Sequence, residues 1–553
     1  MSYSTNMLIP GLAVAAPALY LLVGLTPAAF ANRRPRTMVR LTLAGAVIAL
    51  ACAVLAVTAH LFNSTHSWVL HSFKLPNNLG VFSVNIYFNA VTALMLLLVS
   101  FVGVIVTNYA KNYMEGDVDR GRFHKWLALT LFAILTLILS GNLLFFVLAW
   151  IATSLCLHKL LVFYGERRAA VLSAHKKFIA SRIGDLSLVI AVALIGTTLN
   201  TLDFDLMAQK MAAMQGELPT ALKAAAMLIV AAAGLKSAQF PFHGWLIQVM
   251  EAPTPVSALL HAGIVNAGAF LVLRMTPVVS HYEPALFALS LVGLVTLALA
   301  SLIMLTQTSI KVSLAWSTTA QMGFMLLECG LGLYSLAMLH LVTHSLYKAH
   351  AFLASGSGVD AFRGPQLPKT GKDFRFGRLL LAMMAAVLIV GGVGSVFGLN
   401  LHEQPALLAA AFVVAMASTQ LLFHTANEAG ENNLWLPGLA RIALVSVAYF
   451  SLETLFTAVI RDSVAPVANS GSPLQYALTG LVIITFAALL TMQQILKYYP
   501  ALLGKGIYVH LHNGLYIDVF ITRVIERLWP SPTPLIFSEP APFAPIPTHG
   551  DPS

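Results

Sequence analysis

Long runs of apolar residues, separated by short polar stretches, dominate the whole chain. Each run has the length of a helix that crosses the roughly 30 Å hydrocarbon core of a bilayer, which takes about 20 residues. The runs lie near residues 7–29, 38–62, 81–110, 126–140, 142–164, 178–199, 221–248, 254–276, 285–306, 310–328, 331–357, 378–400, 404–425, 436–460 and 474–496. This pattern predicts an all-α polytopic membrane protein with roughly 14 to 15 transmembrane helices.

Two of these segments carry residues that interrupt a helix. In the seventh segment Lys236 is followed by Pro241, which cannot donate to the helix ladder. The twelfth segment carries Gly391 and Gly394, and we expect a second break there. Irregular backbone at membrane depth is tolerated only where protein or a water-filled cavity satisfies it. Two interrupted helices about five segments apart are typical of inverted-repeat transporters.

The segments divide the chain into consecutive parts. We expect N-terminal transmembrane helices over 1–125, two repeat-like halves over 126–276 and 285–425, and C-terminal transmembrane helices over 436–500. After residue 497 the pattern changes: residues 505–529 mix aromatic, charged and aliphatic side chains and predict a cytoplasmic amphipathic segment. The Pro-rich residues 530–553 are predicted to be a disordered tail.

Composition supports the membrane assignment. Of the 553 residues 58% are hydrophobic and only 10% are charged, whereas about one-quarter of an ordinary soluble protein is charged. The three cysteines, Cys52, Cys156 and Cys329, lie in apolar stretches without CxxC spacing. They exclude an iron–sulfur or structural zinc site made by this chain and offer no disulfide framework. We therefore expect no metal and no cofactor within this chain.

The net charge of +10 is concentrated in alternate connections between the apolar segments. Basic residues cluster after the first, third, fifth and eleventh segments, namely Arg33, Arg34, Arg36, Arg40, Lys111, Arg120, Arg122, Lys125, Arg167, Arg168, Lys176, Lys177, Arg363, Lys369, Lys372, Arg375 and Arg378. Positive charge marks the cytoplasmic side. The N-terminus is therefore predicted outside and the C-terminus in the cytoplasm, and nucleic-acid binding is disfavoured.

Charged side chains inside apolar segments are costly, at least about 2.5–3.5 kcal/mol at the bilayer centre, and usually mark an ion path. Lys236 is the strongest candidate, because burial disfavours its ammonium form and so allows the side chain to bind and release a proton. Asp185 is a path candidate too, although an ion pair with Arg182 explains it nearly as well. Glu403, near the outer end of the twelfth or thirteenth segment, is a candidate exit group.

Three further titratable residues share one face of the eleventh segment. His340, His344 and Lys348 are spaced i, i+4 and i+8, so they lie one above the other at about 6 Å intervals. This arrangement predicts a proton relay, to which His261 of the eighth segment would contribute. A metal site is the rival interpretation of two histidines at i and i+4, but no acidic third ligand is close in the sequence.

At these residues the chain resembles the antiporter-like proton-translocating subunits of respiratory complex I and of Mrp-type cation antiporters. The resemblance covers roughly residues 80–400 and rests on the stretches Asn112–Asp117, Ser181–Asp185, Lys236–Pro241, Ala252–Ala262, His340–Lys348 and Phe352–Gly356. It implies that Lys236 is the central lysine, His261 the linking histidine and Lys348 the lysine of the second half, within antiporter-like inverted repeats.

The chain departs from that family at three places. The family usually has a glutamate after the tryptophan of the fifth helix, whereas Trp150 is followed here by Ile151. Its large members carry a lysine in the broken twelfth helix, and residues 391–400 contain none. Asn89 stands where an aspartate is common.

A shorter branch, the DabB membrane subunits of two-component inorganic-carbon accumulation complexes, is more similar. The stretch His510–Asp518 resembles the C-terminal signature of that branch. The resemblance implies a large zinc-containing partner of the DabA type, similar to a β-carbonic anhydrase, on the cytoplasmic side of a bacterial inner membrane. A cation, H⁺ in first place and Na⁺ as the alternative, would flow downhill and drive CO₂ hydration in the partner. Residues 505–529 are a candidate docking strip, with Tyr508, His512, Tyr516 and Asp518.

Three other functions stay open at this point. They are a proton-pumping subunit of a quinone oxidoreductase, an Mrp-type cation/proton antiporter subunit, and a membrane scaffold without a working ion path.

Overall fold

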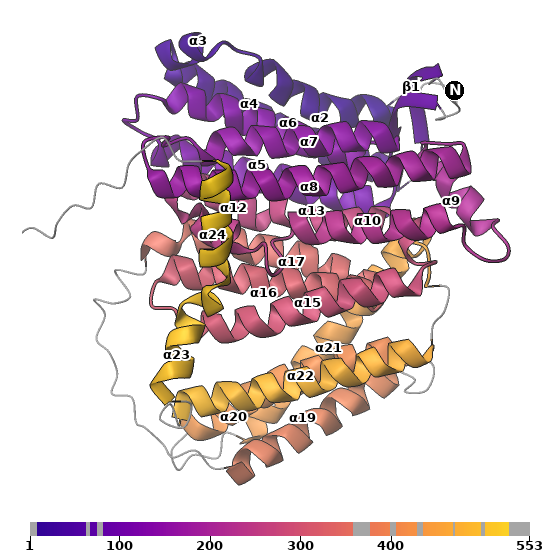
Figure 1. Cartoon of the computed structure of the whole chain (residues 1–553), viewed down its shortest axis with the longest axis vertical. Helices are drawn as coiled ribbons and strands as arrows, with labels where there is room; N and C mark the ends of the chain where they lie inside the picture. The colour runs from indigo at the N-terminus through magenta and orange to yellow at the C-terminus, as the bar shows by residue number, and fades with distance from the viewer. Residues whose placement is uncertain are drawn as a thin grey trace, which may run out of the picture.

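Long helices packed side by side form the protein (Figure 1). The computed structural model describes residues 8–61, 67–74, 81–357, 376–398, 405–428, 435–467, 471–498 and 504–529. Within these ranges eleven helical segments are long and apolar enough to cross a membrane, and one of them, Thr254–Arg274, is made of several short helices. The shorter helix α2 (Leu8–Gly24) is apolar as well. The predicted all-α membrane architecture is confirmed.

The other long helices are α4 (Pro35–His60), α5 (Ala90–Tyr113), α6 (Arg120–Leu139), α7 (Leu143–Leu161), α8 (Arg168–Leu199), α10 (Thr220–Lys236), α15 (Glu283–Met304), α16 (Ile310–Gly330), α17 (Tyr334–Leu353), α19 (Phe376–Val396), α20 (Pro405–Glu428), α21 (Trp435–Ile460) and α22 (Pro473–Tyr498). Shorter elements join them: α3 (Ala28–Arg33), α9 (Phe204–Ala212), α11 (Gly244–Gln248), η1 (Val249–Glu251), α12 (Thr254–Ala262), η2 (Ile264–Asn266), α13 (Ala267–Arg274), α14 (Thr276–Val279), η3 (Ser355–Ser357), η4 (Arg461–Ser463), α23 (Gly504–His512), η6 (Gly514–Tyr516) and α24 (Ile517–Leu528).

The bundle has two ends, which we name by the elements that lie there. The arm end carries α3 and the C-terminal arm, α23 to α24, and the hairpin end carries β1 (Ser67–Lys74), β2 (Val81–Tyr87) and α9 (Figure 1). The arm folds back from α22, and α24 lies across the ends of the bundle helices at the arm end (Figure 1).

The hairpin is an addition to the predicted helices. Strands β1 and β2 pair antiparallel, with Ser67 opposite Tyr87. The apolar run that begins at residue 81 is therefore a strand first and a helix only from Ala90. Asn89 marks the change, because its side chain accepts a hydrogen bond from the backbone N–H of Thr92 at 2.9 Å and caps α5.

The interruption predicted at Pro241 is present. Helix α10 ends at Lys236, and the next helix, α11, begins only at Gly244. The neighbouring span is interrupted too: α12 ends at Ala262 and α13 begins at Ala267, with a turn of 3₁₀ helix between them. The sequence analysis treated residues 254–276 as one unbroken segment, so this second interruption was missed.

The break predicted at Gly391 and Gly394 is wrong, because α19 runs without interruption from Phe376 to Val396. A glycine inside a helix costs only about 1 kcal/mol relative to alanine. Opening the helix would leave backbone groups unpaired in hydrocarbon, at several kcal/mol each. The helix therefore tolerates its glycines, and the chain turns only at Gly398, whose φ is +85°.

Small residues allow the closest helix contacts. A Cβ atom on Gly293 of α15 would meet the backbone of Gly323 on α16, and a Cβ on Gly323 would meet the backbone of Gly293. Such close approach is how helices associate where lipid removes the hydrophobic driving force between them. One continuous core joins α2 through α17, a second connects α15, α16 and α17 with α20, α22 and α23, and a third forms within α19 to α22.

Candidate functional site

The interruption after α10 is held together by hydrogen bonds from other spans. The Ser237 hydroxyl donates to the backbone carbonyl of Val265, in the second interruption, at 3.1 Å. The backbone N–H of Phe240 donates to the Thr296 hydroxyl of α15 at 3.1 Å. The two interrupted spans therefore meet at their breaks, and protein groups replace the missing helix hydrogen bonds.

Lys236, the last residue of α10, is buried at this break with 5% of its surface exposed. Its ammonium nitrogen lies 4.3 Å from the ring centroid of Trp150 on α7, and it has no hydrogen-bond partner within the described ranges. A buried ammonium whose N–H groups lack an acceptor is poorly stabilised compared with one in water.

Three charged groups of α8 surround Lys236. Arg182 and Asp185 form an ion pair of 2.6 Å, which is the alternative explanation that the sequence analysis gave for Asp185. Both groups also lie within electrostatic range of Lys236. Lys177 is the third, and it donates to the backbone carbonyl and hydroxyl of Ser154 at 2.7 and 2.9 Å.

Lys176 and Lys177 correct the charge map drawn from the sequence. They were counted with the cytoplasmic connection after the fifth segment, but α8 already begins at Arg168. Both lysines therefore lie on the helix and are buried, 3% and 2% exposed. The position of a basic residue beside an apolar run could not show that the helix starts earlier than the run.

The second half contributes a separate cluster around α17. The His261 ring of α12 stacks on Phe352 of α17 with centroids 4.2 Å apart, and neither of its ring nitrogens has a partner in the described part of the chain. His344 lies against the backbone carbonyl of His261. Lys348 is 1% exposed and donates to the carbonyl of Leu314 on α16 at 3.1 Å. The structure thus brings together His261, His344 and Lys348.

Glu328 extends this cluster toward the hairpin end. Its carboxylate lies 2.8 Å from the Nδ1 atom of His340, whose ring centroid is 6.0 Å from that of His344. The sequence analysis did not include Glu328 among the candidate path residues. An acid among apolar residues, 7% exposed here, was the signal that could have added it to these candidates.

The titratable groups therefore span the bundle in depth. Helix α8 starts at the arm end, where Arg168 pairs with Glu526 of α24, and Lys177 and Asp185 follow along it. Lys236, His261 and His344 lie near the two breaks, and the Glu328–His340 pair lies closer to the hairpin end, where α17 begins. Among the described residues no hydrogen bond joins the Lys236 group to the His261 group.

Some residues of the C-terminal arm that the sequence analysis predicted to dock a partner contact the helix bundle of this chain. The Asp518 carboxylate accepts hydrogen bonds from Lys176 Nζ at 2.8 Å and from Gln248 Nε2 at 2.8 Å. A His512 ring nitrogen lies 2.9 Å from the carbonyl of Thr306. Tyr508 and Tyr516 are 45% and 43% exposed. Asp518, His512 and Tyr508 thus contact the bundle, since the Tyr508 hydroxyl also donates to the Thr306 carbonyl at 3.4 Å, and Tyr508, His512 and Tyr516 all remain exposed.

Two kinds of prediction remain: those for residues outside the described ranges, and the prediction on metal binding. Glu403 and the tail 530–553 lie outside the described residues. Within the described ranges no group of three or more His, Cys, Asp or Glu side chains is placed to hold a metal ion. The absence of a cofactor in the whole chain stays a prediction.

Comparisons with known proteins match this architecture. Residues 140–399 match the family model of the NADH:quinone oxidoreductase/Mrp antiporter transmembrane region, and residues 78–124 match that of the complex I chain 5 N-terminus. A probable inorganic carbon transporter subunit DabB2 of Halothiobacillus neapolitanus is 42% identical over 86% of this chain and 86% of its own length. A probable inorganic carbon transporter subunit DabB of Hydrogenovibrio crunogenus is 36% identical over 83% of this chain and 86% of its own length.

Among solved structures, the Mrp complex of a Dietzia species superposes on 95% of this chain and 59% of that chain, with a TM-score of 0.63 and 21% identity. At that identity the likeness concerns the fold alone, and it agrees with the antiporter-type arrangement of the spans.

Proposed function

Because the chain belongs to the DabB family of inorganic carbon transporter subunits, we propose that it conducts a cation, H⁺ in first place, through the groups around Lys236 and α17. This flow energises CO₂ hydration to bicarbonate in a zinc-containing partner of the DabA type. The observation that carries the proposal is Lys236, a buried ammonium without a hydrogen-bond partner in the described ranges, at the junction of two interrupted spans.

The described groups provide a route with protonatable side chains at successive depths. Asp185 and Lys177 lead from the arm end to Lys236, and His261, His344 and the Glu328–His340 pair continue toward the hairpin end. Histidine changes its protonation near neutral pH, which makes it a suitable relay group. Side-chain motion or water has to connect the two clusters, since no direct hydrogen bond is found between them among the described residues.

The energy available is sufficient for coupling. A membrane potential of 100 mV supplies about 2.3 kcal/mol for each charge that crosses. Each 1.4 kcal/mol shifts an equilibrium by about tenfold. One cation per turnover therefore biases a hydration step toward bicarbonate by more than tenfold. Catalysis itself belongs to the partner, and this chain acts as its transport subunit.

The orientation we propose places the arm end in the cytoplasm of a bacterial cell with the chain in the inner membrane. In support, basic residues gather at the arm end, where α3 ends and where α4, α6 and α8 begin: Arg33, Arg36, Arg120, Arg122 and Arg168. Cytoplasmic loops carry such an excess of Lys and Arg. The partner would then dock at the arm end, beside α24.

The test compares Lys236→Ala with Lys223→Ala in a bacterium that needs added CO₂ to grow and that also expresses the partner. Lys223 is the matched control, because it lies on the same helix but pairs with Glu217 near the exposed start of α10. We expect Lys236→Ala to abolish growth in air while the complex still co-purifies, and Lys223→Ala to rescue growth like the wild type. Growth in air with Lys236→Ala would refute the proposal.

The same variants separate the other functions. If the chain is an Mrp-type antiporter subunit, Lys236→Ala should change tolerance to sodium or high pH. If it is a quinone oxidoreductase subunit, the variant should change quinone-dependent proton pumping. In both cases growth in air should be unaffected. Potential-driven cation uptake into vesicles that hold the complex then identifies the cation. If the vesicles take up Na⁺ and not H⁺, Na⁺ takes the place of H⁺ in the proposal.

A further inference from the structure

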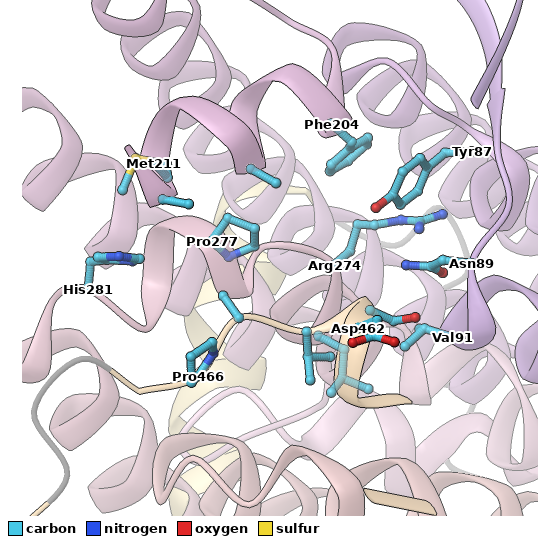
Figure 2. A pocket seen from close by; sticks show the side chains of 16 residues that line it. Tyr87, Asn89, Val91, Phe204, Met211, Arg274, Pro277, His281, Asp462 and Pro466 are labelled. Carbon is cyan, nitrogen blue, oxygen red and sulfur yellow. The ribbon is translucent and has the colours of Figure 1, made fainter. Parts of the chain in front are cut away.

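A pocket of about 450 Å³ lies at the hairpin end, away from the groups assigned to the ion path (Figure 2). Four regions that are far apart in the sequence form its wall. They are the junction of β2 with α5, helix α9, the junction of α13 with α14, and the segment after α21. A cavity that four separate regions build around polar side chains is the usual form of a small-ligand site.

Arg274, the last residue of α13, lies in the wall of this pocket with only 5% of its surface exposed. One guanidinium nitrogen, Nη2, donates to the carbonyl of Ile138 at 2.7 Å. The other two, Nε and Nη1, have no hydrogen-bond partner in the described part of the chain. The guanidinium also lies over the rings of Tyr87 and Phe204, 4.8 and 5.3 Å from their centroids.

The rings offset only part of the cost of burying this charge. A ring face attracts the positive charge, but it does not accept the in-plane N–H groups of the guanidinium as a carboxylate or carbonyl oxygen would. None of the ion pairs found in the described ranges includes Arg274. Arg274 is therefore a buried cation in the wall of a cavity, with no carboxylate paired to it among the described residues.

Two neutral donors flank the guanidinium. Figure 2 shows Arg274 between the Tyr87 ring and the Asn89 side chain. The Asn89 side-chain oxygen accepts from the backbone N–H and hydroxyl of Thr92, and its NH₂ group hydrogen-bonds the Tyr87 phenol. The second N–H of Asn89 and the O–H of Tyr87 are left to bind a ligand. Burial raises the pKa of the Tyr87 phenol, so that it stays protonated and able to donate. All three side chains thus offer N–H or O–H groups to a ligand.

The acidic residues around the pocket do not neutralise the positive charge of Arg274. Asp462 is exposed at the pocket, where water and salt screen its charge. Asp203 and Asp205 lie within electrostatic range of Tyr87, but the Asp203 carboxylate is already bound by Asn85 and by the first backbone N–H groups of α9. The free donors belong to Arg274, Tyr87 and Asn89.

We propose that this pocket binds a small oxyanion, a carboxylate- or phosphate-type group, on the guanidinium of Arg274. A planar guanidinium presents five donors in a fixed fork that matches the oxygens of such groups. Tyr87 and Asn89 supply the flanking hydrogen bonds. Free bicarbonate or phosphate and the phosphate of an anionic lipid headgroup share this chemistry, because the pocket lies where the helices end.

Binding is tested on the full chain purified in detergent, without the partner, so the result does not depend on the ion path. The midpoint of thermal unfolding is followed as bicarbonate or inorganic phosphate is titrated against chloride at equal ionic strength. Native mass spectrometry then compares retained phosphatidylglycerol with phosphatidylcholine. We expect saturable binding of a free oxyanion or selective retention of the anionic lipid; neither effect in the wild type would overturn the proposal.

Two conservative variants locate the site. Arg274→Lys keeps the charge but removes the planar fork, and it should weaken binding by about tenfold or more. Tyr87→Phe keeps the ring that stacks on Arg274 and should weaken binding by about threefold, which keeps the test informative if the Arg274 variant does not fold. Arg461→Gln, an exposed neighbour outside the pocket wall, is the control. Unchanged binding in both conservative variants would contradict the assignment to this pocket.

Discussion

The ammonium nitrogen of Lys236 lies 4.3 Å from the centre of the Trp150 ring, and Trp150 is 1% exposed. The lysine therefore meets the face of an aromatic ring at the position where α7 passes the break of α10. A ring face stabilises the cation without taking its proton, unlike a carboxylate, which would hold the charge in place. In the proposed mechanism this contact, next to Ile151 in place of an acid, leaves the proton of Lys236 exchangeable.

Replacing Trp150 tests this contact. Trp150→Leu removes an interaction that contributes about 2 kcal/mol in a desolvated site, so proton flux through the complex should fall by about tenfold or more. Trp150→Phe keeps a weaker ring face and should retain more flux than Trp150→Leu. Flux is measured as potential-driven acidification inside vesicles. Equal flux in wild type and Trp150→Leu would show that the ring contact has no part in conduction.

Glu328 should be required at the hairpin side of the path. Glu328→Gln keeps the shape of the side chain but removes the charge that pairs with His340, and it should lower flux and growth in air by about tenfold or more. Glu453→Gln on α21 is the matched control, because within the described part of the chain Glu453 bonds only to the hydroxyls of Ser335 and Thr457. If the two variants behave alike, Glu328 is a structural residue.

Asp518 should fix the C-terminal arm to the bundle. Asp518→Ala leaves the ammonium of Lys176, only 2% exposed in its side chain, without its carboxylate, at a cost of about 1.5–3 kcal/mol. We expect a lower unfolding midpoint and faster protease cleavage in α24. Arg523→Ala, an exposed change on the same helix, should alter neither. An arm that resists cleavage in Asp518→Ala would mean that other contacts hold it.

The outward face of α24 should bind the partner. Phe520, Val524 and Leu528 follow at i, i+4 and i+8, so they share one face of the helix, and Phe520 and Leu528 are 67% and 72% exposed. The double change Phe520→Ser and Leu528→Ser should abolish co-purification of the partner while the chain stays in the membrane fraction. Full recovery of the partner with this variant would place docking elsewhere.

The sequence by itself determined the class of fold, most of the spans and the break beside Lys236. These features depend on local composition: an apolar run of sufficient length has to become a helix in lipid, and a proline interrupts it where it stands. The shared face of His340, His344 and Lys348 follows from helical spacing in the same way. The family also came from such local stretches, such as the one from Lys236 to Pro241.

Only the tertiary structure decided which polar groups meet. The pairing of Glu328 with His340, the fixation of Asp518 by Lys176 and the ring beneath Lys236 each join residues of different helices. Whether a glycine opens a helix, as expected wrongly for Gly391, also depends on neighbours that can replace the backbone hydrogen bonds. The pocket around Arg274 needs four distant regions of the chain, so no local pattern could have shown it.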